Sequence, residues 1–382
     1  MQTNLIQSVL DGAEGREADR ILRSCVHCGF CTATCPTYQE LGDELDGPRG
    51  RIYLIKNLLE GEAPTRRTQT HLDRCLTCLN CETTCPSGVE YHKLIDIGRN
   101  RIEQQVSRPL GERLMRWGLR QLVPYPRRFG PLLRFGQALR PLLPARLKGK
   151  LPPPDRVEQS RPAAGVHARQ VILLQNCVEP LLTPRVVAAT VRVLDALGIG
   201  VLQPGGGCCG AVSPHLSAPA EARRFMRGNI DAWWPAIEAG AETILVTASG
   251  CGAMVKDYGW HLRDDPAYAE RAARVSSLAR DLSELLSTED LARLPSPTSR
   301  GVPARIAFHP PCTLQHGQGL TGRVERLLGG VGFDLQPVRD SHSCCGSAGT
   351  YSILQSELAG RLRTKKLDAL EQGAPVLIAT AN

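Results

Sequence analysis

The 382-residue sequence lacks long hydrophobic runs: no apolar stretch approaches the ~20 residues that a helix needs to cross a bilayer. Its first 15 residues have no basic segment followed by an apolar one, so we expect no secretory signal peptide. Cysteine is also sparse for a disulfide scaffold, since the chain has 15, about 4%. These absences favour a reducing, cytoplasmic setting in which thiols are available to bind metal.

Fingerprints of nucleotide-dependent catalysis are missing as well. Gly205, Gly206 and Gly207 precede cysteines, whereas the glycine-rich turn of a dinucleotide site opens a phosphate-binding helix. No recognised nucleic-acid-binding motif accompanies the positive charge, so we expect no nucleic-acid partner. We therefore assign no catalytic side chain and look for function in the cysteines.

Eight of the cysteines form two copies of one pattern, C-x2-C-x2-C-x3-C-P, which begin at Cys25 and at Cys75. This pattern is typical of ferredoxins with two [4Fe–4S] clusters, in which the last cysteine of each run binds the other cluster. The spacing therefore predicts two clusters with crossed ligands. The expected ligand sets are Cys25, Cys28, Cys31 and Cys85 for the first cluster, and Cys75, Cys78, Cys81 and Cys35 for the second.

Structural zinc is the main alternative, because paired C-x-x-C motifs commonly hold zinc. A zinc site needs neither a third cysteine at the same spacing nor the following Cys-Pro, and both runs contain these. Two complete runs therefore favour iron–sulfur clusters. His27 and His71 flank the loops, and we interpret them as hydrogen-bonding partners of cluster sulfur rather than as metal ligands.

The chain changes its pattern near residue 166. Before residue 107 the segments between cysteines, such as 51–60, favour helix, and little is typical of strands. After it, short strand-like runs alternate with helical stretches, and the order repeats, which predicts a mostly parallel sheet in each repeat. The expected strands are 171–174, 199–202, 244–247, 305–308, 333–338 and 376–379, and the expected helices 186–197, 220–239, 324–328 and 352–370.

The predicted fold class is a multidomain α+β chain, in which an α-helical two-cluster ferredoxin domain precedes two α/β repeats. Each repeat contains a Cys-Cys-Gly sequence, so we call them the Cys-Cys-Gly repeats. The expected domains are 1–107 (ferredoxin-like), 108–165 (a basic, Pro-rich amphipathic linker), 166–299 (first repeat) and 300–382 (second repeat).

The cysteines of the repeats follow strands, and the carboxyl ends of parallel strands share one edge of a sheet. The first repeat offers Cys177, Cys208, Cys209 and Cys251, a set that can hold a further iron–sulfur cluster. The second offers Cys312, Cys344 and Cys345, an incomplete set. Aligning the two repeats puts the expected fourth cysteine just beyond Asn382, so this repeat looks incomplete at its C-terminal end and we expect it to be weakly occupied.

Three alternatives stay open for these cysteines: buried structural thiols, zinc, or a vicinal redox disulfide. His309, His316 and His342 lie near the second set, and we interpret them as hydrogen-bonding loop residues, with metal ligation as the alternative. The repeats thus leave room for one or two additional iron–sulfur clusters beyond the two [4Fe–4S] clusters of the ferredoxin-like domain.

Most of the positive charge lies in one segment. Residues 99–150 contain 13 Arg and Lys against two Glu, a net charge of +11 in a chain whose total is +8. Leu110, Leu114 and Trp117 recur at helical spacing, and five prolines are expected to divide the segment into short helices. Such a segment can lie on an anionic membrane surface, or its apolar face can pack on a neighbouring domain.

The motifs resemble a known family. The stretches 25–56 (CVHCGFC through DGPRGRIYLIK) and 72–89 closely resemble the iron–sulfur subunit of bacterial glycolate oxidase, also called glycolate dehydrogenase. The Cys-Cys-Gly repeats fit as well, so the resemblance covers nearly the whole chain. These repeats are also shared with heterodisulfide reductase and with lactate-oxidising and anaerobic glycerol-3-phosphate dehydrogenase subunits, whereas the N-terminal motifs are more specific.

The resemblance implies an electron-transfer subunit of a multisubunit enzyme that oxidises glycolate to glyoxylate. FAD-containing partner subunits would take the hydride, and this subunit would pass electrons to a membrane acceptor, a quinone, from a peripheral position on the inner face of the cytoplasmic membrane. The alternatives are the same role in a lactate or glycerol-3-phosphate dehydrogenase complex, or a zinc-stabilised scaffold that assembles the flavin subunits. The chain departs from the family pattern at the absent last cysteine of the second repeat.

Overall fold

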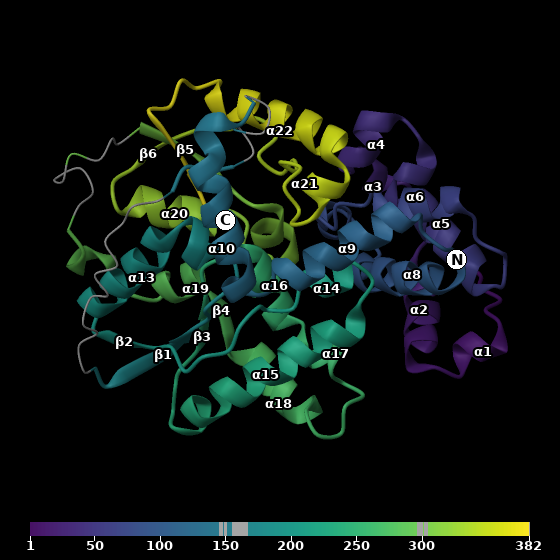
Figure 1. Ribbon diagram of the computed structural model, residues 1–382, viewed down its shortest axis with the longest axis horizontal. Helices are drawn as coiled ribbons and strands as arrows, with labels where there is room; N and C mark the ends of the chain where they lie inside the picture. The colour runs from purple at the N-terminus through teal and green to yellow at the C-terminus, as the bar shows by residue number, and fades with distance from the viewer. Residues whose placement is uncertain (145–147, 149–150, 155–166, 296–300, 302–304, 382) are drawn as a thin grey trace.

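The N-terminal region is helical. The computed structural model describes residues 1–382 except 145–147, 149–150, 155–166, 296–300, 302–304 and 382 (Figure 1). Among the described residues before β1, no strand occurs, which confirms the expected helical ferredoxin region. The helices are α1 (Gln7–Leu10), α2 (Ala13–Ser24), α3 (Phe30–Ala33), α4 (Pro36–Leu41), the 3-10 helix η1 (Glu44–Asp46), α5 (Pro48–Leu59), α6 (Arg66–Asp73), α7 (Asn80–Thr83) and α8 (Tyr91–Gln105).

One hydrophobic core holds these helices and the cysteine loops together. Leu22 of α2, Ile55 of α5 and Leu94 of α8 are fully buried in it, because apolar residues at helical spacing give each helix one buried face. Cys25 and Cys75, which open the two loops, belong to the same core. The helix bundle therefore fixes the start of each loop.

Two further helices follow: α9 (Leu110–Leu122), which lies near the middle of Figure 1, and α10 (Pro126–Leu139). The expected division into short helices is wrong at Pro131, which lies inside α10. Pro126 opens this helix at a position where proline is favourable, and Pro131 removes one backbone hydrogen bond without ending the helix. The 3-10 helix η2 (Arg140–Leu142) follows.

The first repeat has a four-stranded parallel sheet in the order β2-β1-β3-β4. Its strands are β1 (Arg169–Leu173), β2 (Ile199–Leu202), β3 (Ile244–Val246) and β4 (Ala279–Asp281). The first three are the expected ones. The sequence did not predict β4, because its three residues include an exposed Arg280 and form no apolar run.

The second repeat has a three-stranded parallel sheet in the order β6-β5-β7, so the prediction of parallel sheets is confirmed in both repeats. Its strands are β5 (Arg305–His309), β6 (Asp334–Gln336) and β7 (Leu377–Thr380). The helix expected at 352–370 is two helices, α21 (Tyr351–Leu354) and α22 (Ser356–Glu371), interrupted at Gln355.

Helices cover both faces of the first sheet, since successive side chains of a strand point to opposite faces. Val171 and Leu173 of β1 pack in one cluster with α13 (Pro184–Ala196). Ile172 packs in another with α15 (Pro219–Glu238) and α18 (Ala269–Leu278). The remaining elements of the repeats are α12 (Glu179–Leu182), α14 (Val212–His215), α16 (Ser249–Lys256), α17 (Tyr258–His261), α19 (Leu282–Leu286), η3 (Leu291–Arg293), the π-helix η5 (Thr313–Gly317) and α20 (Arg323–Gly330).

The two repeats meet where α16 contacts η5. Ser249 Oγ lies 2.7 Å from Thr313 Oγ1, and Gln318 Nε2 donates to the Ser249 carbonyl at 2.9 Å. Because α16 carries Cys251 and Cys312 immediately precedes η5, this contact lies beside the cysteines of both repeats.

Candidate metal centres

The two ferredoxin-type loops share an unusual backbone. The residues two and four positions after the first cysteine have positive φ in both: His27 (57°) and Gly29 (85°), then Thr77 (53°) and Leu79 (62°). Non-glycine residues adopt this left-handed conformation at a cost of about 1–2 kcal/mol, so it persists only where the surroundings require it. The two copies of the cysteine pattern therefore fold into matching loops.

The structure brings each predicted ligand set to one cavity. The two cavities have empty volumes of about 440 and 300 Å³, including space open to solvent. In each, the fourth predicted ligand comes from the other loop, which is the crossed arrangement that the spacing predicts. The first cavity is lined by Cys25, Cys28, Cys31 and Cys85, and the second by Cys35, Cys75, Cys78 and Cys81.

The cavities share a wall. Pro48, Cys81 and Tyr91 line both, so the two sites are neighbours. The Tyr91 hydroxyl, buried in this wall, donates a hydrogen bond of 3.7 Å to Cys75 Sγ. A second donor, the amide of Thr77, lies 3.4 Å from the same sulfur. Two donors thus face the sulfur of one predicted ligand of the second cluster.

The protonation of the buried thiols indicates what the cavities can hold. Burial, followed by the nearby Cys25 and Cys28, raises the pKa of Cys31 to about 11. Burial also raises the pKa of Cys81, with Cys78 next in effect. Four such thiols cannot all ionise in a cavity without a compensating positive charge, and metal ions supply that charge. The donor set, thiols among apolar groups, therefore fits an iron–sulfur cluster.

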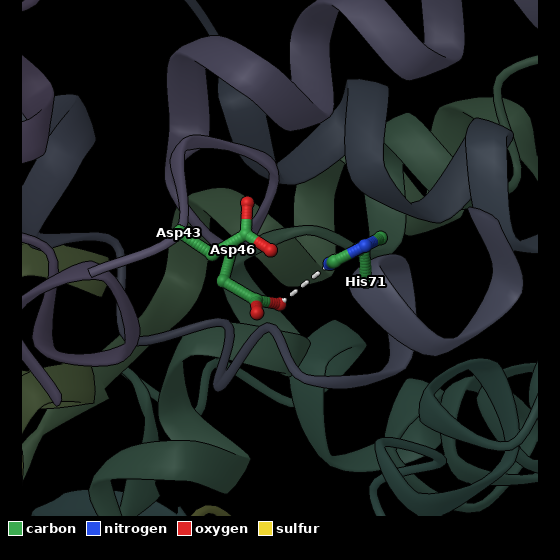
Figure 2. Close-up of side chains that lie close together, drawn as sticks. All are labelled: Asp43, Asp46 and His71. Carbon is green, nitrogen blue, oxygen red and sulfur yellow. Dashed lines mark hydrogen bonds and ion pairs between the residues drawn. The ribbon is translucent and has the colours of Figure 1, made fainter. Parts of the chain in front are cut away.

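Beside the second cavity lies a buried carboxylate that sequence reasoning missed. Figure 2 shows Asp43, Asp46 and His71, whose potential ligand atoms lie within 4.8 Å of one another. Asp46 is fully buried and accepts from Arg74 at 2.8 Å and pairs with His71 Nδ1 at 3.0 Å. Arg51 lies 3.5 Å from the same carboxylate. The guanidiniums of Arg51 and Arg74 make this group an ion-pair centre, and we assign no metal to it.

The same contacts bear on His71, for which a hydrogen bond to cluster sulfur stays a prediction. Its Nδ1 faces the Asp46 carboxylate and not a cluster sulfur, and its Nε2 is buried without a hydrogen-bond partner among the described residues. The signal that could have pointed to this centre was the charged sequence Asp46-Gly47-Pro48-Arg49-Gly50-Arg51 at the start of α5. Sequence alone does not say which of its charges is buried.

In the first repeat the four predicted cysteines lie at the carboxyl edge of the sheet. Cys177 follows β1, the Cys208-Cys209 pair follows β2, and Cys251 is in α16 after β3. Hydrogen bonds from Cys177 and Cys209 lower the pKa of Cys208 to about 4, and they raise the pKa of both partners. Cys209 also contacts Cys251, so the four thiols form one group.

Polar side chains from α15 and α17 hold the backbone of this pair. Asn229 Nδ2 donates to the Cys208 carbonyl at 2.9 Å, and the Tyr258 hydroxyl donates to the Cys209 carbonyl at 2.8 Å. Gly206, at φ 100°, approaches Asn229 so closely that a Cβ would lie 2.8 Å from its Oδ1. The glycines before the pair thus allow a close turn against α15.

The second repeat brings its three cysteines together in the same way. Cys344 contacts Cys312 and Cys345 through hydrogen bonds, which raise its pKa. Beside them, His309 Nδ1 lies 3.0 Å from Thr380 Oγ1, and its Nε2 is buried with no hydrogen-bond partner among the described residues. The position expected for a fourth cysteine, beyond Asn382, lies outside the described residues.

This second thiol group borders the second cavity. The Cys78 thiol is a hydrogen-bond partner of Cys344, and both pack with Leu76 in one apolar cluster. Asn80 Nδ2 donates to the His342 carbonyl at 3.3 Å across the same boundary. The spacing of the cysteines gave no sign of this contact.

Histidines near the second repeat act as hydrogen-bonding residues. His316 Nδ1 lies 2.9 Å from Thr83 Oγ1, and its Nε2 lies 3.3 Å from the His342 carbonyl. His309, at the end of β5, and His316, in η5, thus both make hydrogen bonds, and the His342 contact is made by its backbone.

Family models match this architecture. A model described as "4Fe-4S dicluster domain" matches residues 21–89, and one described as "Cysteine-rich domain" matches residues 171–256 and 306–382. The fold and cysteine sets thus define a two-cluster ferredoxin region joined to a duplicated cysteine-rich domain.

Three relatives place the chain more narrowly. It is 58% identical over 383 residues to the "Glycolate oxidase iron-sulfur subunit" of Escherichia coli (strain K12), an alignment covering 100% of this chain and 93% of the relative. It is 30% identical to the "Probable glycolate oxidase iron-sulfur subunit" of Bacillus subtilis (strain 168), covering 94% and 86%. It is 29% identical to the "Lactate utilization protein A" of Exiguobacterium sp. over 54% of this chain and 84% of the relative.

The chain belongs to the glycolate oxidase iron–sulfur subunit family. In the part of the chain that the structure describes, no helix is both long and apolar enough to cross a membrane.

Proposed function

We propose that this chain is the electron-transfer subunit of a glycolate dehydrogenase and relays electrons from FAD-containing subunits toward a membrane acceptor, a quinone. The observation that carries the proposal is the pair of adjacent cavities, each of which brings together the four thiols of one predicted ligand set, with one of the four supplied by the opposite loop. The relatives named for glycolate oxidase support the choice of substrate.

In this role the residues bind, separate and shield the clusters. When bound, [4Fe–4S] clusters accept and donate single electrons. The eight ferredoxin-type cysteines hold them, and Pro48 and Tyr91 form the wall between the two sites. No side chain here is assigned to the oxidation of glycolate to glyoxylate, which belongs to the flavin subunits.

The repeats extend the proposed relay. Four thiols in the first repeat and three in the second offer further iron–sulfur ligation, and the second group borders the second cavity. An electron that reaches the second cavity would therefore have its nearest onward thiols in the second repeat. The corresponding ligands are Cys177, Cys208, Cys209 and Cys251, and Cys312, Cys344 and Cys345.

Metal analysis and electron paramagnetic resonance of the anaerobically purified full chain test the proposal. We expect about eight irons and eight sulfides from the ferredoxin region, and two interacting signals after reduction. Iron beyond this amount would indicate that the Cys-Cys-Gly repeats also bind clusters. Stoichiometric zinc with no signal after reduction would instead support a zinc-stabilised scaffold.

The substrate of the complex needs a separate measurement, because it binds to the partners. The alternative substrates are lactate and glycerol-3-phosphate. The likeness to "Lactate utilization protein A" over 54% of the chain favours lactate over glycerol-3-phosphate as the alternative. The complex purified through this subunit should reduce a quinone analogue with glycolate. Faster reduction with lactate or glycerol-3-phosphate would contradict the assignment.

We also propose that α9 and α10 attach the chain to the inner face of the cytoplasmic membrane. Leu110, Trp117 and Phe135 are 80%, 52% and 64% exposed, beside the exposed Arg113 and Arg134. Exposed apolar side chains between arginines suit an anionic lipid surface, where each basic residue contributes about 1 kcal/mol.

Vesicle sedimentation tests this attachment. The full chain should bind vesicles that contain phosphatidylserine, and bind them less as salt increases, because salt screens the charge. Replacing Trp117 and Phe135 by Ser should weaken binding. Equal binding to phosphatidylcholine vesicles, or no binding to either kind of vesicle, would contradict this attachment. It would support the alternative, in which the apolar face of the segment packs on a neighbouring domain.

A further inference from the structure

Arg51 of α5 is a buried cation at the second cavity. Its side chain lines the cavity together with Cys35 and Cys75, and the residue is only 1% exposed. An arginine is almost never buried to this extent unless its guanidinium is paired. The groups that pair with this guanidinium therefore determine how its charge acts on the cavity.

The guanidinium donates hydrogen bonds through two of its nitrogens, and its third nitrogen donates none among the described residues. Its Nε donates to the His71 carbonyl at 2.7 Å, and its Nη1 donates to Thr37 Oγ1 at 3.1 Å. Its Nη2 is buried and makes no hydrogen bond among the described residues, although it lies 3.5 Å from Asp46 Oδ1. A charged donor is thus left over at a cavity lined by thiols.

The local charge is not cancelled. Asp46 is the only carboxylate with which Arg51 forms an ion pair among the described residues, and that carboxylate also accepts from Arg74 at 2.8 Å. Two guanidiniums therefore share one carboxylate beside the second cavity.

The first cavity has no equivalent. The arginine that lines it, Arg49, has a side chain that is 38% exposed and pairs with Glu44 at 2.6 Å. A cation that is neutralised and open to water acts weakly on its surroundings. Among the residues that line the two cavities, the second thus has one buried positive charge that the first lacks.

We propose that the buried positive charge of Arg51, which lines the second cavity, raises the reduction potential of the cluster held there. Hydrogen bonds to sulfur and local charge are two of the factors that set such potentials, because reduction adds negative charge. The inference rests on the proposed function, which places a cluster there. It concerns a one-electron equilibrium, and no bond is made or broken.

The test is a redox titration of the full chain, followed by electron paramagnetic resonance. Arg51→Met removes the charge while keeping much of the side-chain volume. At a fixed potential near the midpoint, we expect the ratio of reduced to oxidised cluster to fall about tenfold, which is about 59 mV for one electron. Only one of the two signals should shift, and it should be the signal that Cys35→Ser perturbs.

Three further variants separate charge from structure. Arg49→Met is the matched control and should leave the second-cavity potential unchanged. Arg51→Lys keeps the charge and should shift the potential less than Arg51→Met. Asp46→Asn removes the shared negative charge and should shift the potential in the opposite direction, which a purely structural role of Arg51 does not produce.

The outcomes distinguish the two proposals. If the unaltered chain holds about eight irons and Arg51→Met leaves both potentials unchanged at full iron content, the inference about Arg51 is overturned and the proposed function stands. If Arg51→Met loses its cluster, Arg51→Lys and Asp46→Asn decide: no shift in either overturns the inference. If the unaltered chain holds no cluster, both proposals fail.

Discussion

The two Cys-Cys-Gly repeats carry the same turn in different surroundings. In each, the amide two residues after the first cysteine of the pair faces its sulfur at 3.4 Å: Gly210 and Cys208, then Gly346 and Cys344. In the first repeat the cysteines are held by that repeat's own α15 and α17. In the second repeat Cys344 contacts Cys78 of the ferredoxin region. One copy holds its Cys-Cys pair with helices of its own repeat, and the other has its pair in contact with the ferredoxin region.

Because of this difference, two copies of one fold hold their cysteines in different surroundings. A self-contained site keeps its properties when its neighbours change, whereas a site at a boundary depends on the group it meets. We therefore expect substitutions in the second repeat to alter the ferredoxin region, and substitutions in the first repeat to stay local.

The largest expected effect is the loss of a cluster. Cys35→Ser removes a ligand of the second cavity, so iron should fall by up to about four atoms per chain, while the signal of the first cluster persists. Iron analysis and electron paramagnetic resonance measure this. Loss of the Cys25, Cys28 and Cys31 cluster instead would show that the ligands are not crossed. Because the second cavity borders Cys344, the variant should also slow electron flow into the second repeat.

A matched pair of substitutions tests the contrast between the repeats directly. Cys209→Ala and Cys345→Ala each remove the second cysteine of a pair. Only Cys345→Ala should change the spectrum of the second-cavity cluster, because its neighbour Cys344 contacts Cys78. An equal change in both variants would mean that the boundary contact does not matter.

The paired turns should differ in their tolerance of a side chain. Gly210 and Gly346 have φ values of 95° and 76°, so alanine costs about 1–2 kcal/mol at either position. At Gly346 a Cβ would also lie 2.5 Å from the Ala359 carbonyl oxygen, against 3.3 Å from the Ala222 carbonyl oxygen at Gly210. Gly346→Ala should therefore lower the thermal unfolding midpoint more than Gly210→Ala, and the reverse order would contradict this packing.

The smallest expected effect is at Tyr258, which is fully buried in the first repeat. Tyr258→Phe removes the hydrogen bond to the Cys209 carbonyl at 2.8 Å and the one accepted from Asn229 Nδ2 at 2.9 Å, and it leaves Asn229 with its bond to the Cys208 carbonyl. We expect a loss of about 1 kcal/mol in the free energy of unfolding. The second-cavity signal should not change, which chemical denaturation and spectroscopy can check together.

Sequence predicted the parts of this molecule that depend on local pattern. The spacing of eight cysteines predicted which thiols line each cavity, because ligand loops are short and regular. Apolar runs predicted six strands, since buried parallel strands are locally apolar. Two features were not predicted because the local signal was absent or misleading. The strand β4 has no apolar run, and α10 continues through Pro131, where the sequence predicted a break.

What sequence did not predict depends on distant contacts. Nothing near Arg51 shows that it is buried against Asp46 and the second cavity, because its partners lie in four separate segments. The same holds for Cys78 and Cys344, which come from opposite ends of the chain. Such contacts follow from tertiary packing and not from periodicity.

The contact between Cys78 and Cys344 also bears on the order in which the protein is made. Asn80 and His342, which bond across this boundary, are separated by 262 residues. The ribosome therefore releases the ferredoxin region well before the segment that covers Cys78 exists, and domains generally fold in the order of synthesis. Iron and sulfide have an open approach to the second cavity during that interval. Docking of the last repeat then covers this side, so we expect the second cavity to take up iron and sulfide faster before docking than after it.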